Sequence, residues 1–397
     1  MDNHVLITDY LWFQEGPGVR NTQYTTDGVK LLNVANFVDG NIDLTTSSRY
    51  ISDEEAYGKY KHFLVDEGDF LIASSGIQVD YFEKKMGFIR PEQLPLCMNT
   101  STIRFKNLKP DELDMRYFMY YLKSNAFKNQ LAKYIVGSAQ LNFGPSHLKK
   151  MTFPVVEIKR QKYIVENLEK IYTLITLRKE QLAKLDQLVK SRFIEQFGDP
   201  VINPKGWPIK SLLDMGYCKN GMNFHTGDSG IEMHCLGVGD FKDLSVIDGT
   251  EQLPVVSLNE APPEESMLRD GDIVFVRSNG NKALVGRCLV VYPRKTPTTY
   301  SGFCIRYRLT SNEVDTAYLL RVLKTDSMRK KMAGRGANIQ NLNQQILASL
   351  DIPIPPMEMQ KQFATFVDLT DKSKLAIQQS LDKLELLKKS LMQEYFG

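Results

Sequence analysis

The segment QKYIVENLEKIYTLITLRKEQLAKLDQLVKSRFIEQFG, residues 161–198, recurs in diverged form as QKQFATFVDLTDKSKLAIQQSLDKLELLKKSLMQEYFG, residues 360–397. The two copies are 199 residues apart and identical at 11 of 38 positions, whereas unrelated sequences would match at about two. The 397-residue chain is therefore predicted to be a tandem repeat. Two variable modules of about 150 residues alternate with two similar segments of about 40.

The repeated segments are predicted to be long helices. Apolar residues of the first copy recur at alternating steps of three and four, and no Gly or Pro lies between Pro154 and Gly198. The second copy carries polar Thr370 and Lys374 at two seam positions. The predicted spacer and subunit-docking positions are Leu168, Ile171, Ile175, Leu182, Leu185, Val189, Ile377, Leu381, Leu384 and Leu391.

A helix of about 36 residues is about 54 Å long, which is more than one compact domain needs. Two such helices related by a repeat are expected to pack as an antiparallel, coiled-coil-like spacer with a pseudo-two-fold axis. The alternative is that each helix packs only on its own module.

Each variable module has the pattern of an α+β domain. Short β-branched or aromatic runs bounded by Gly, Pro, Asn or Asp predict strands at 70–73, 273–276, 283–291 and 303–309. Helices are predicted around 115–134 and 316–332. The predicted fold class is α+β, with two α/β domains joined by two long antiparallel helices, and the boundaries are 1–155, 156–198, 199–350 and 351–397.

The composition is that of an ordinary globular protein. Fifty basic and 47 acidic residues give a net charge of +3, so any basic surface has to be local. No apolar run approaches the roughly 20 residues of a membrane span, and the start of the chain lacks a signal-peptide pattern, so a cytoplasmic location is expected. Five scattered cysteines without a Cys-x-x-Cys pair predict reduced thiols.

Catalytic and metal-binding patterns are missing from the sequence. It has no nucleophile elbow, glycine-rich phosphate loop, dinucleotide fingerprint or His-Glu-x-x-His motif. His234 and Cys235 fit no common zinc spacing, so no metal site is predicted. Asp69 is followed by an acidic-x-Lys pattern that resembles the carboxylate motif of nucleases. No such pattern follows Asp272, its counterpart in the repeat. Both aspartates are therefore predicted to form turns that lead into strands.

One part of the chain suggests DNA binding. The stretch from Arg269 to Arg308 holds eight basic and two acidic residues, which makes it a candidate phosphate-facing strand surface. Within it, residues 277–282 (RSNGNK) combine Arg and Asn, which can recognise base edges, with a Gly that permits close approach. The first module has a corresponding loop at residues 74–78. A solvated hairpin is the alternative for any single residue of these loops.

Three runs resemble the specificity (S) subunit of type I restriction-modification systems. They are GRGANIQNLNQQILASLDIPIPPMEMQKQF at 334–363, GSAQLNFGPSHLKKMTFPVVEIKRQKYI at 137–164 and SRFIEQFGDP at 191–200. The resemblance implies two target-recognition domains, each reading one half of a bipartite double-stranded DNA site. It also implies that the helices set the spacer and dock two methyltransferase subunits, which two motor-nuclease subunits can join.

By this resemblance the chain itself is not catalytic and binds no cofactor. S-adenosylmethionine, and ATP with Mg²⁺ for cleavage, would enter through the partners, which methylate adenine at N6 and cut DNA. Gly137 and Gly336 would lie with their neighbours in loops beside the DNA. The candidate DNA-binding residues are Arg20, Asn21, Lys30, Ser74, Ser75, Gln78, Lys84, Gln140, Asn142, Asn223, His225, Arg277, Ser278, Asn279, Lys282, Arg335, Asn338, Gln340 and Asn341.

Three other functions stay open at this point. The chain could be the specificity subunit of a related multisubunit system of type IIB character. It could be a methyltransferase or nuclease with unrecognised motifs, or a coiled-coil scaffold that does not bind DNA. A methylation assay on the isolated chain separates the enzyme from the specificity subunit, and sequence-blind DNA binding would favour the scaffold.

Overall fold

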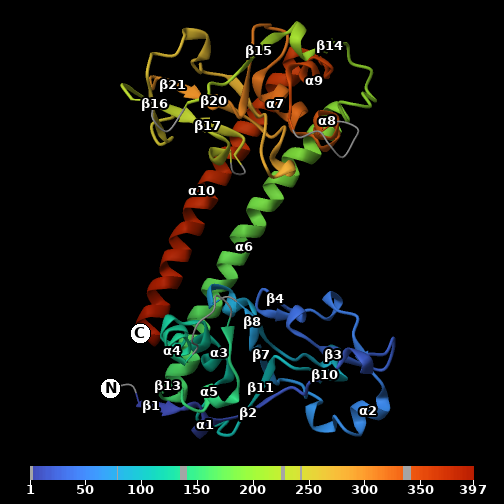
Figure 1. The fold of residues 1–397 in the computed structure, drawn as a ribbon, viewed down its shortest axis with the longest axis vertical. Helices are drawn as coiled ribbons and strands as arrows, with labels where there is room; N and C mark the ends of the chain where they lie inside the picture. The colour runs from blue at the N-terminus through green and yellow to red at the C-terminus, as the bar shows by residue number, and fades with distance from the viewer. Residues whose placement is uncertain (1–2, 78, 135–140, 225–228, 242–243, 334–340) are drawn as a thin grey trace. The chain divides into compact units, whose positions relative to one another are not determined.

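The computed structural model describes residues 3–77, 79–134, 141–224, 229–241, 244–333 and 341–397. The chain forms two compact units, one of Met1–Arg178 with Ser380–Gly397 and the other of Lys179–Gln379. Each unit holds one α+β module and half of each of two long helices, α6 (Ile158–Phe197) and α10 (Met357–Phe396) (Figure 1). The predicted class, with two mixed modules and two long helices, is confirmed.

The module of the first unit is built on two sheets. The larger has the order β2 (Leu11–Glu15), β11 (Thr102–Asn107), β7 (Phe70–Ala73), β9 (Met86–Phe88), with every neighbour antiparallel. The smaller has the order β10 (Leu96–Met98), β3 (Val29–Leu32), β6 (Tyr50–Ile51), and β10 runs parallel to β3.

Shorter elements complete this module. The paired strands are β1 (Asn3–Leu6) with β13 (Thr152–Val155), β8 (Ser75–Ile77) with β12 (Leu141–Asn142), and β4 (Phe37–Val38) with β5 (Asn41–Ile42). The helices are α1 (Ile7–Tyr10), α2 (Asp53–Tyr57), α3 (Met115–Lys123), α4 (Asn125–Tyr134) and α5 (Pro145–Leu148). Aromatic rings fill the core between α3 and the larger sheet, where the Phe105 and Phe118 centroids are 5.4 Å apart.

The module of the second unit repeats this plan. Its larger sheet has the order β15 (Gly216–Asn220), β22 (Cys304–Leu309), β19 (Asp272–Val276), β20 (Cys288–Tyr292), β17 (Val246–Asp248). Its smaller sheet has the order β18 (Val255–Leu258), β16 (Ile231–Leu236), β21 (Thr298–Tyr300), and β21 runs parallel to β16. The remaining elements are the pair β14 (Ile209–Ser211) with β23 (Asp351–Pro353), and α7 (Thr316–Lys324), α8 (Asp326–Ala333) and α9 (Gln344–Ala348). Compared with the larger sheet of the first module, this sheet has one additional strand, β17, which runs parallel to β20.

Several predicted elements of the modules differ from the structure. The strand predicted for 283–291 begins only at Cys288, because Gly286 adopts a left-handed turn with a φ of 76°. The helices predicted over 115–134 and 316–332 are each two helices. Ser124 and Thr325 interrupt them, and their hydroxyls accept hydrogen bonds from backbone N–H groups of the helix that follows.

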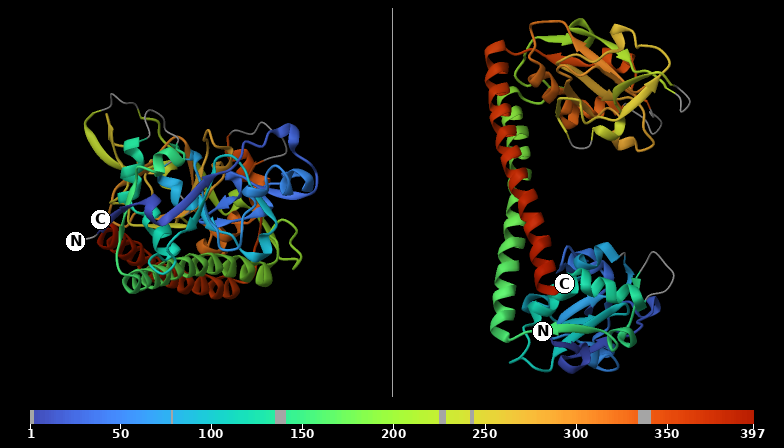
Figure 2. Two further views of the ribbon diagram at one scale, coloured as in Figure 1. Left: turned by 90° about the horizontal axis from the view of Figure 1, so that it is seen from below. Right: turned by 90° about the vertical axis from the view of Figure 1, so that its left-hand side faces the viewer.

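The long helices run antiparallel within each unit (Figure 2). In the first unit, Lys388 of α10 lies 5.4 Å from the ring centroid of Tyr172 of α6. In the second, the rings of Phe193 and Phe363 are 5.5 Å apart, and Lys374 forms an ion pair with Asp186 at 2.6 Å. The polar seam residue Lys374 is therefore satisfied by the opposite helix.

The predicted seam residues line this contact to different degrees. Leu168, Ile171, Ile175, Val189 and Leu381 are buried. The half-buried ones are Leu182, Leu185, Ile377, Leu384 and Leu391. The other polar seam residue, Thr370, is buried and donates its hydroxyl proton to the Phe366 carbonyl of its own helix at 2.8 Å.

The repeated glutamines tie each long helix to its module. Both side chains are fully buried. The Gln161 Oε1 accepts from the backbone N of Asp114, the N-cap of α3, at 2.9 Å, and its Nε2 donates to two backbone carbonyls. Gln360 makes the equivalent three bonds and accepts from Asp315, the N-cap of α7, at 2.8 Å. Because both glutamines make the same three hydrogen bonds at the same junction, the sequence repeat is strongest in the segments that form these junctions.

Candidate nucleic-acid interface

Four segments of the second module meet at one end of its five-stranded sheet and form what we call the second loop cluster. They are residues 220–223, 277–278, 301–304 and 341–342. The backbone N of Arg277 donates to the Phe303 carbonyl at 2.8 Å, and the N of Leu342 donates to the Arg277 carbonyl at 2.8 Å. Ser278 and Asn341 form an antiparallel bridge. The predicted loop 277–282 and the segment after residue 340 are therefore neighbours.

The first module has an equivalent arrangement, the first loop cluster. It consists of residues 15–16, 74–75, 99–102 and 142–143. The N of Ser74 donates to the Ser101 carbonyl at 2.9 Å, and the N of Phe143 donates to the Ser74 carbonyl at 3.0 Å. Ser75 pairs with Asn142 between β8 and β12. Main-chain bonds of the same kind thus build both clusters, with Ser74 in the place of Arg277 and Ser101 in the place of Phe303.

Two glycines make these clusters compact. A Cβ added to Gly16 would overlap the Asn99 carbonyl oxygen, and one added to Gly221 would overlap the Ser301 carbonyl oxygen. Only a residue without a side chain lets the strand end lie this close to the facing turn. The positions are equivalent in the two modules, so the close approach is part of the shared scaffold.

Several predicted DNA-binding residues of the first module lie at its cluster. Ser75 belongs to it. Arg20 and Asn21 are exposed and follow a segment that is tied to the cluster, because the N of Val19 donates to the Asn99 Oδ1 at 3.2 Å. Asn99 itself was not predicted, since a buried asparagine gives no sequence signal of its role.

Three other predicted residues of this module lie in different surroundings. Ser74 is fully buried, and its backbone builds the cluster, so its contact with DNA stays a prediction. Lys30 lies on β3 with its Nζ 5.1 Å from the Tyr50 ring centroid. Lys84 pairs with Asp39 at 3.3 Å. Neither lysine is part of the loop cluster.

In the second module the structure brings together Asn223, Arg277, Ser278 and Asn341. The Nη1 of Arg277 donates to the Gly302 carbonyl at 3.3 Å, which leaves the other guanidinium donors available. Asn223 and Asn341 are exposed. These side chains offer donors and acceptors of the types that recognise base edges.

The remaining predicted residues are only partly described or not described. Asn279 uses its side-chain oxygen to accept from the backbone N of Asn281 at 2.8 Å, which shapes the loop. For Asn142 and Lys282 only the backbone is described. The residues outside the described ranges are Gln78, Gln140, His225, Arg335, Asn338 and Gln340, together with Gly137 and Gly336.

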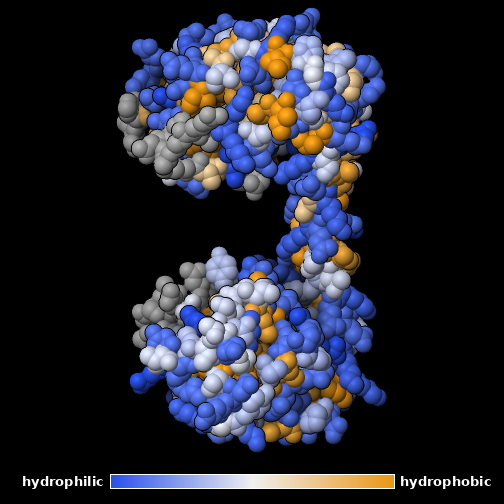
Figure 3. All heavy atoms as spheres, turned by 90° about the vertical axis from the view of Figure 1, so that its right-hand side faces the viewer, coloured by the Kyte–Doolittle hydropathy of each residue, from blue (hydrophilic) through white to orange (hydrophobic). Residues whose placement is uncertain are grey.

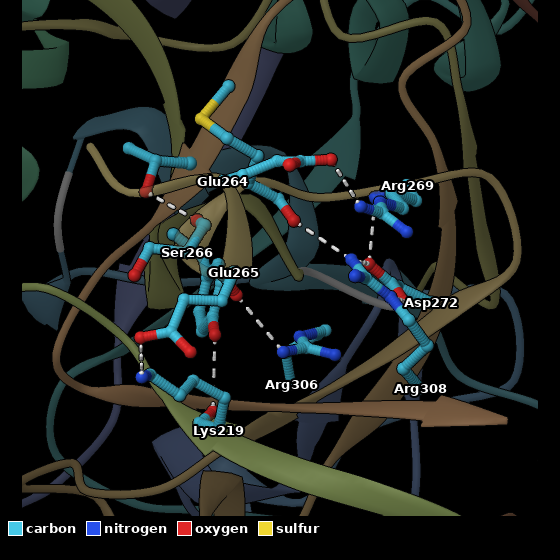
Figure 4. Close-up of polar contacts among 11 residues, drawn as sticks. Lys219, Glu264, Glu265, Ser266, Arg269, Asp272, Arg306 and Arg308 are labelled. Carbon is cyan, nitrogen blue, oxygen red and sulfur yellow. Dashed lines mark hydrogen bonds and ion pairs between the residues drawn. The ribbon is translucent and has the colours of Figure 1, made fainter. Parts of the chain in front are cut away.

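Two arginines of the predicted phosphate-facing strand surface, Arg306 and Arg308, instead make their contacts within the module. Arg306 is fully buried, and its Nη2 donates to the Glu265 carbonyl at 3.1 Å (Figure 4). Arg308 forms an ion pair with Asp272 at 2.7 Å, and this hydrogen bond raises the pKa of the Arg308 guanidinium. Two further arginines form ion pairs on the surface, Arg269 with Glu264 and Arg294 with Asp248 and Asp270. Of these acidic partners, Glu264 and Asp248 come from outside the basic stretch and reduce its local excess of positive charge.

The first module contains the same buried arginine. Arg104 of β11 lies 5.4 Å from the Trp12 ring centroid, as Arg306 of β22 lies 4.9 Å from that of Tyr217. Arg104 also contacts the Asp69 carboxylate at 3.4 Å. These arginines are structural parts of the sheets.

The two aspartates compared with a nuclease pattern form turns, as predicted. The Asp69 Oδ2 accepts from the backbone N of Asp66 at 2.9 Å, and the Asp272 Oδ2 accepts from that of Arg269 at 2.7 Å. Burial raises the pKa of the Asp69 carboxyl. Across the described ranges, no group of three His, Cys, Asp or Glu side chains is placed to hold a metal ion.

Exposed apolar residues mark the long helices of both units. Figure 3 shows hydrophobic residues among hydrophilic ones along these helices. The first unit exposes Leu174, Leu177, Leu386 and Leu387, and the second exposes Leu188, Ile194, Leu369 and Leu375.

The sequence family described as "Type I restriction modification DNA specificity domain" matches residues 28–187 and 265–386, more than half of the chain. The chain belongs to this family. The two matched regions include most of the first module, the later part of the second and much of both long helices.

Individual relatives are similar over a large part of the chain. The StySPI specificity subunit of Salmonella potsdam is 24% identical over 314 residues, covering 73% of this chain and 66% of its own length. The EcoKI specificity subunit of Escherichia coli is 21% identical over 317 residues, with the same coverages. This chain thus spans about two thirds of the length of these relatives.

Solved structures share the fold. The S subunit of the type I system of M. genitalium superposes with a TM-score of 0.55 and 16% identity, covering 100% of this chain and 96% of the other. A chain from a study of the assembly of a type I system gives a TM-score of 0.60 at 16% identity, covering 99% and 97%. In the part of the chain that is described, no helix combines the length and apolarity needed to cross a membrane.

Proposed function

We propose that this chain is the DNA-specificity subunit of a type I restriction-modification complex. Each module would bind one half of a bipartite site through its loop cluster, and the long helices would set the spacer between the halves. The observation that carries the proposal is the pair of equivalent loop clusters, whose main-chain bonds hold different side chains at matching positions. Family membership supports it.

In this proposal the chain itself catalyses no reaction. Methylation of adenine N6 would be done by two methyltransferase subunits that bind S-adenosylmethionine, and cleavage by motor-nuclease subunits that use ATP and Mg²⁺. The exposed apolar residues of α6 and α10 are the proposed docking surface for the methyltransferase subunits.

A reconstitution tests this function. The purified chain, the methyltransferase subunits from the same host and the two together are incubated with unmethylated DNA, amplified from the host genome, and labelled S-adenosylmethionine. We expect incorporation only with both present. Incorporation by this chain alone would contradict the proposal, and so would sequence-blind labelling by the mixture.

A surface substitution tests the docking part. Leu386→Glu places a charge at a 69% exposed position of α10, and Leu108→Glu does so at a 56% exposed loop position of the first module. We expect the first change to weaken co-purification with the methyltransferase subunit and the second to leave it intact. If both variants co-purified equally well with the methyltransferase subunit, the helices would not be its docking surface.

A further inference from the structure

Phe303 is the most exposed aromatic side chain in the described part of the chain, with 60% of its surface accessible. It precedes β22, whose first residue, Cys304, is buried. Exposed single apolar residues are common, so exposure alone assigns no role. The surroundings of Phe303 provide the argument.

The backbone beneath the ring is held on every side. The Phe303 carbonyl accepts from the N of Arg277 at 2.8 Å and from the N of Ser278 at 3.3 Å, and its own N donates to the Ser301 Oγ at 3.3 Å. The side-chain oxygen of Asn223 lies against the preceding Gly302, at the place a Cβ would take. The backbone that carries the ring is therefore held in position, so little backbone ordering is needed on binding.

The residues bonded to the turn of Phe303 carry hydrogen-bonding side chains. Arg277 and Ser278 donate their backbone N–H groups to the Phe303 carbonyl, and the Asn223 side chain lies against Gly302. An apolar group among donors and acceptors matches the major-groove edge of an A·T pair, where the thymine methyl lies beside polar atoms. Ser101 takes the same position in the first module and offers no such apolar surface.

We propose that the Phe303 ring contacts the 5-methyl group of a thymine in the half-site bound by the second module. This inference rests on the proposed function and adds the base that one residue discriminates. It also makes the two half-sites chemically unequal, since the first module recognises its half without an aromatic contact at this turn.

Deoxyuridine, which lacks only the methyl group, provides the test. The site is first defined by the methylation pattern of the wild-type complex, and each thymine of the second half is then replaced singly. We expect one of these replacements to weaken DNA binding by the complex about four- to tenfold, which is the loss expected when one methyl group is removed from a buried contact. The Phe303→Ala complex should bind less tightly and be indifferent to that same replacement, because the two changes remove one contact.

The controls separate the possible failures. Ser101→Ala should leave the deoxyuridine effect unchanged, and replacements in the first half-site should affect wild-type and Phe303→Ala complexes equally. If the wild-type complex methylates a bipartite site but tolerates every deoxyuridine, or if Phe303→Ala keeps the sensitivity, the thymine contact is overturned while the proposed function stands. If the Phe303→Ala chain failed to assemble with the other subunits in the absence of DNA, the thymine contact would also be overturned. Absence of any site-specific methylation by the wild-type complex contradicts the proposed function itself.

Discussion

The two loop clusters have the same main-chain bonds but different side chains. Arg277 and Phe303 of the second module stand where the first module has Ser74 and Ser101. Backbone N–H and carbonyl groups hold each turn, so these hydrogen bonds form with different side chains, although Ser101 adopts a left-handed φ of 64° and Phe303 does not. Under the proposed function, a scaffold of this kind would let the two modules recognise different DNA sequences by substitution of side chains alone.

The sheets differ in how they neutralise a buried aspartate. Asp272 is paired at 2.7 Å with Arg308, and their side chains are 2% and 11% exposed. In the first module the position of Arg308 is held by Lys106, whose side chain is 40% exposed and bonds mainly to the surface residue Asp66. The modules thus keep the aspartate turn but stabilise it by different ion pairs.

The largest expected effect comes from breaking the buried pair. Arg308→Met should lower the free energy of unfolding by about 3–5 kcal/mol, because it leaves the Asp272 charge buried without its partner. Lys106→Met, at the equivalent position, should cost about 1 kcal/mol or less, since that pair is largely solvated. Urea unfolding of the two variants measures both values, and equal losses would refute the proposed difference between the sheets.

A second pair of substitutions should affect both modules alike. Gln161→Leu and Gln360→Leu each leave three backbone groups without a buried partner, so we expect each to cost about 2–4 kcal/mol. Gln187→Leu, on the exposed face of α6, should change stability by less than about 0.5 kcal/mol. A large difference between the first two variants, in denaturant unfolding, would show that the helix-to-module junctions are not equivalent.

The loop clusters themselves should respond unequally to substitution. Arg277→Ala should weaken binding of the second half-site by about 1–3 kcal/mol and relax its sequence preference, leaving the first half-site intact. Ser74→Ala, the matched change, should alter neither, because that side chain is buried. Binding of duplexes mutated in one half at a time gives the answer. If Arg277→Ala degraded both halves equally, Arg277 would be a phosphate or structural contact.

The smallest effect is expected at Arg306. This buried guanidinium has two N–H groups, Nε and Nη1, without a hydrogen-bond partner. The loss of one bond to Glu265 is therefore offset by removal of buried unpaired donors. Arg306→Met should change the free energy of unfolding by no more than about 1 kcal/mol. A loss as large as that of Arg308→Met would mean that Arg306 is a main support of the sheet.

The helices were predictable because their signal is local. Apolar residues at steps of three and four, with no Gly or Pro inside, specify a helix without knowledge of its surroundings. The breaks at Ser124 and Thr325 were not foreseen, since each depends on a hydroxyl that caps the following helix. Sheet order was also not predicted, because it depends on pairings between strands far apart in the sequence.

The candidate site was predictable only in part, for a related reason. The repeat located the loops at Ser75 and Ser278 in corresponding places. The charge of Arg306 and Arg308 was visible, but the distant residues that bury or neutralise it were not. Phe303 was assigned to a strand because it opens a short run of β-branched and aromatic residues that follows Gly302, yet the strand begins one residue later and leaves Phe303 exposed.

The most direct test of the central claim is the adenine methylome of host cells with and without this chain. We predict that one split motif, with two specified halves separated by an unspecified spacer, disappears when the chain is removed. Exchange of the second module should then change one half of that motif and preserve the other. An unchanged methylome on removal of the chain would contradict the account.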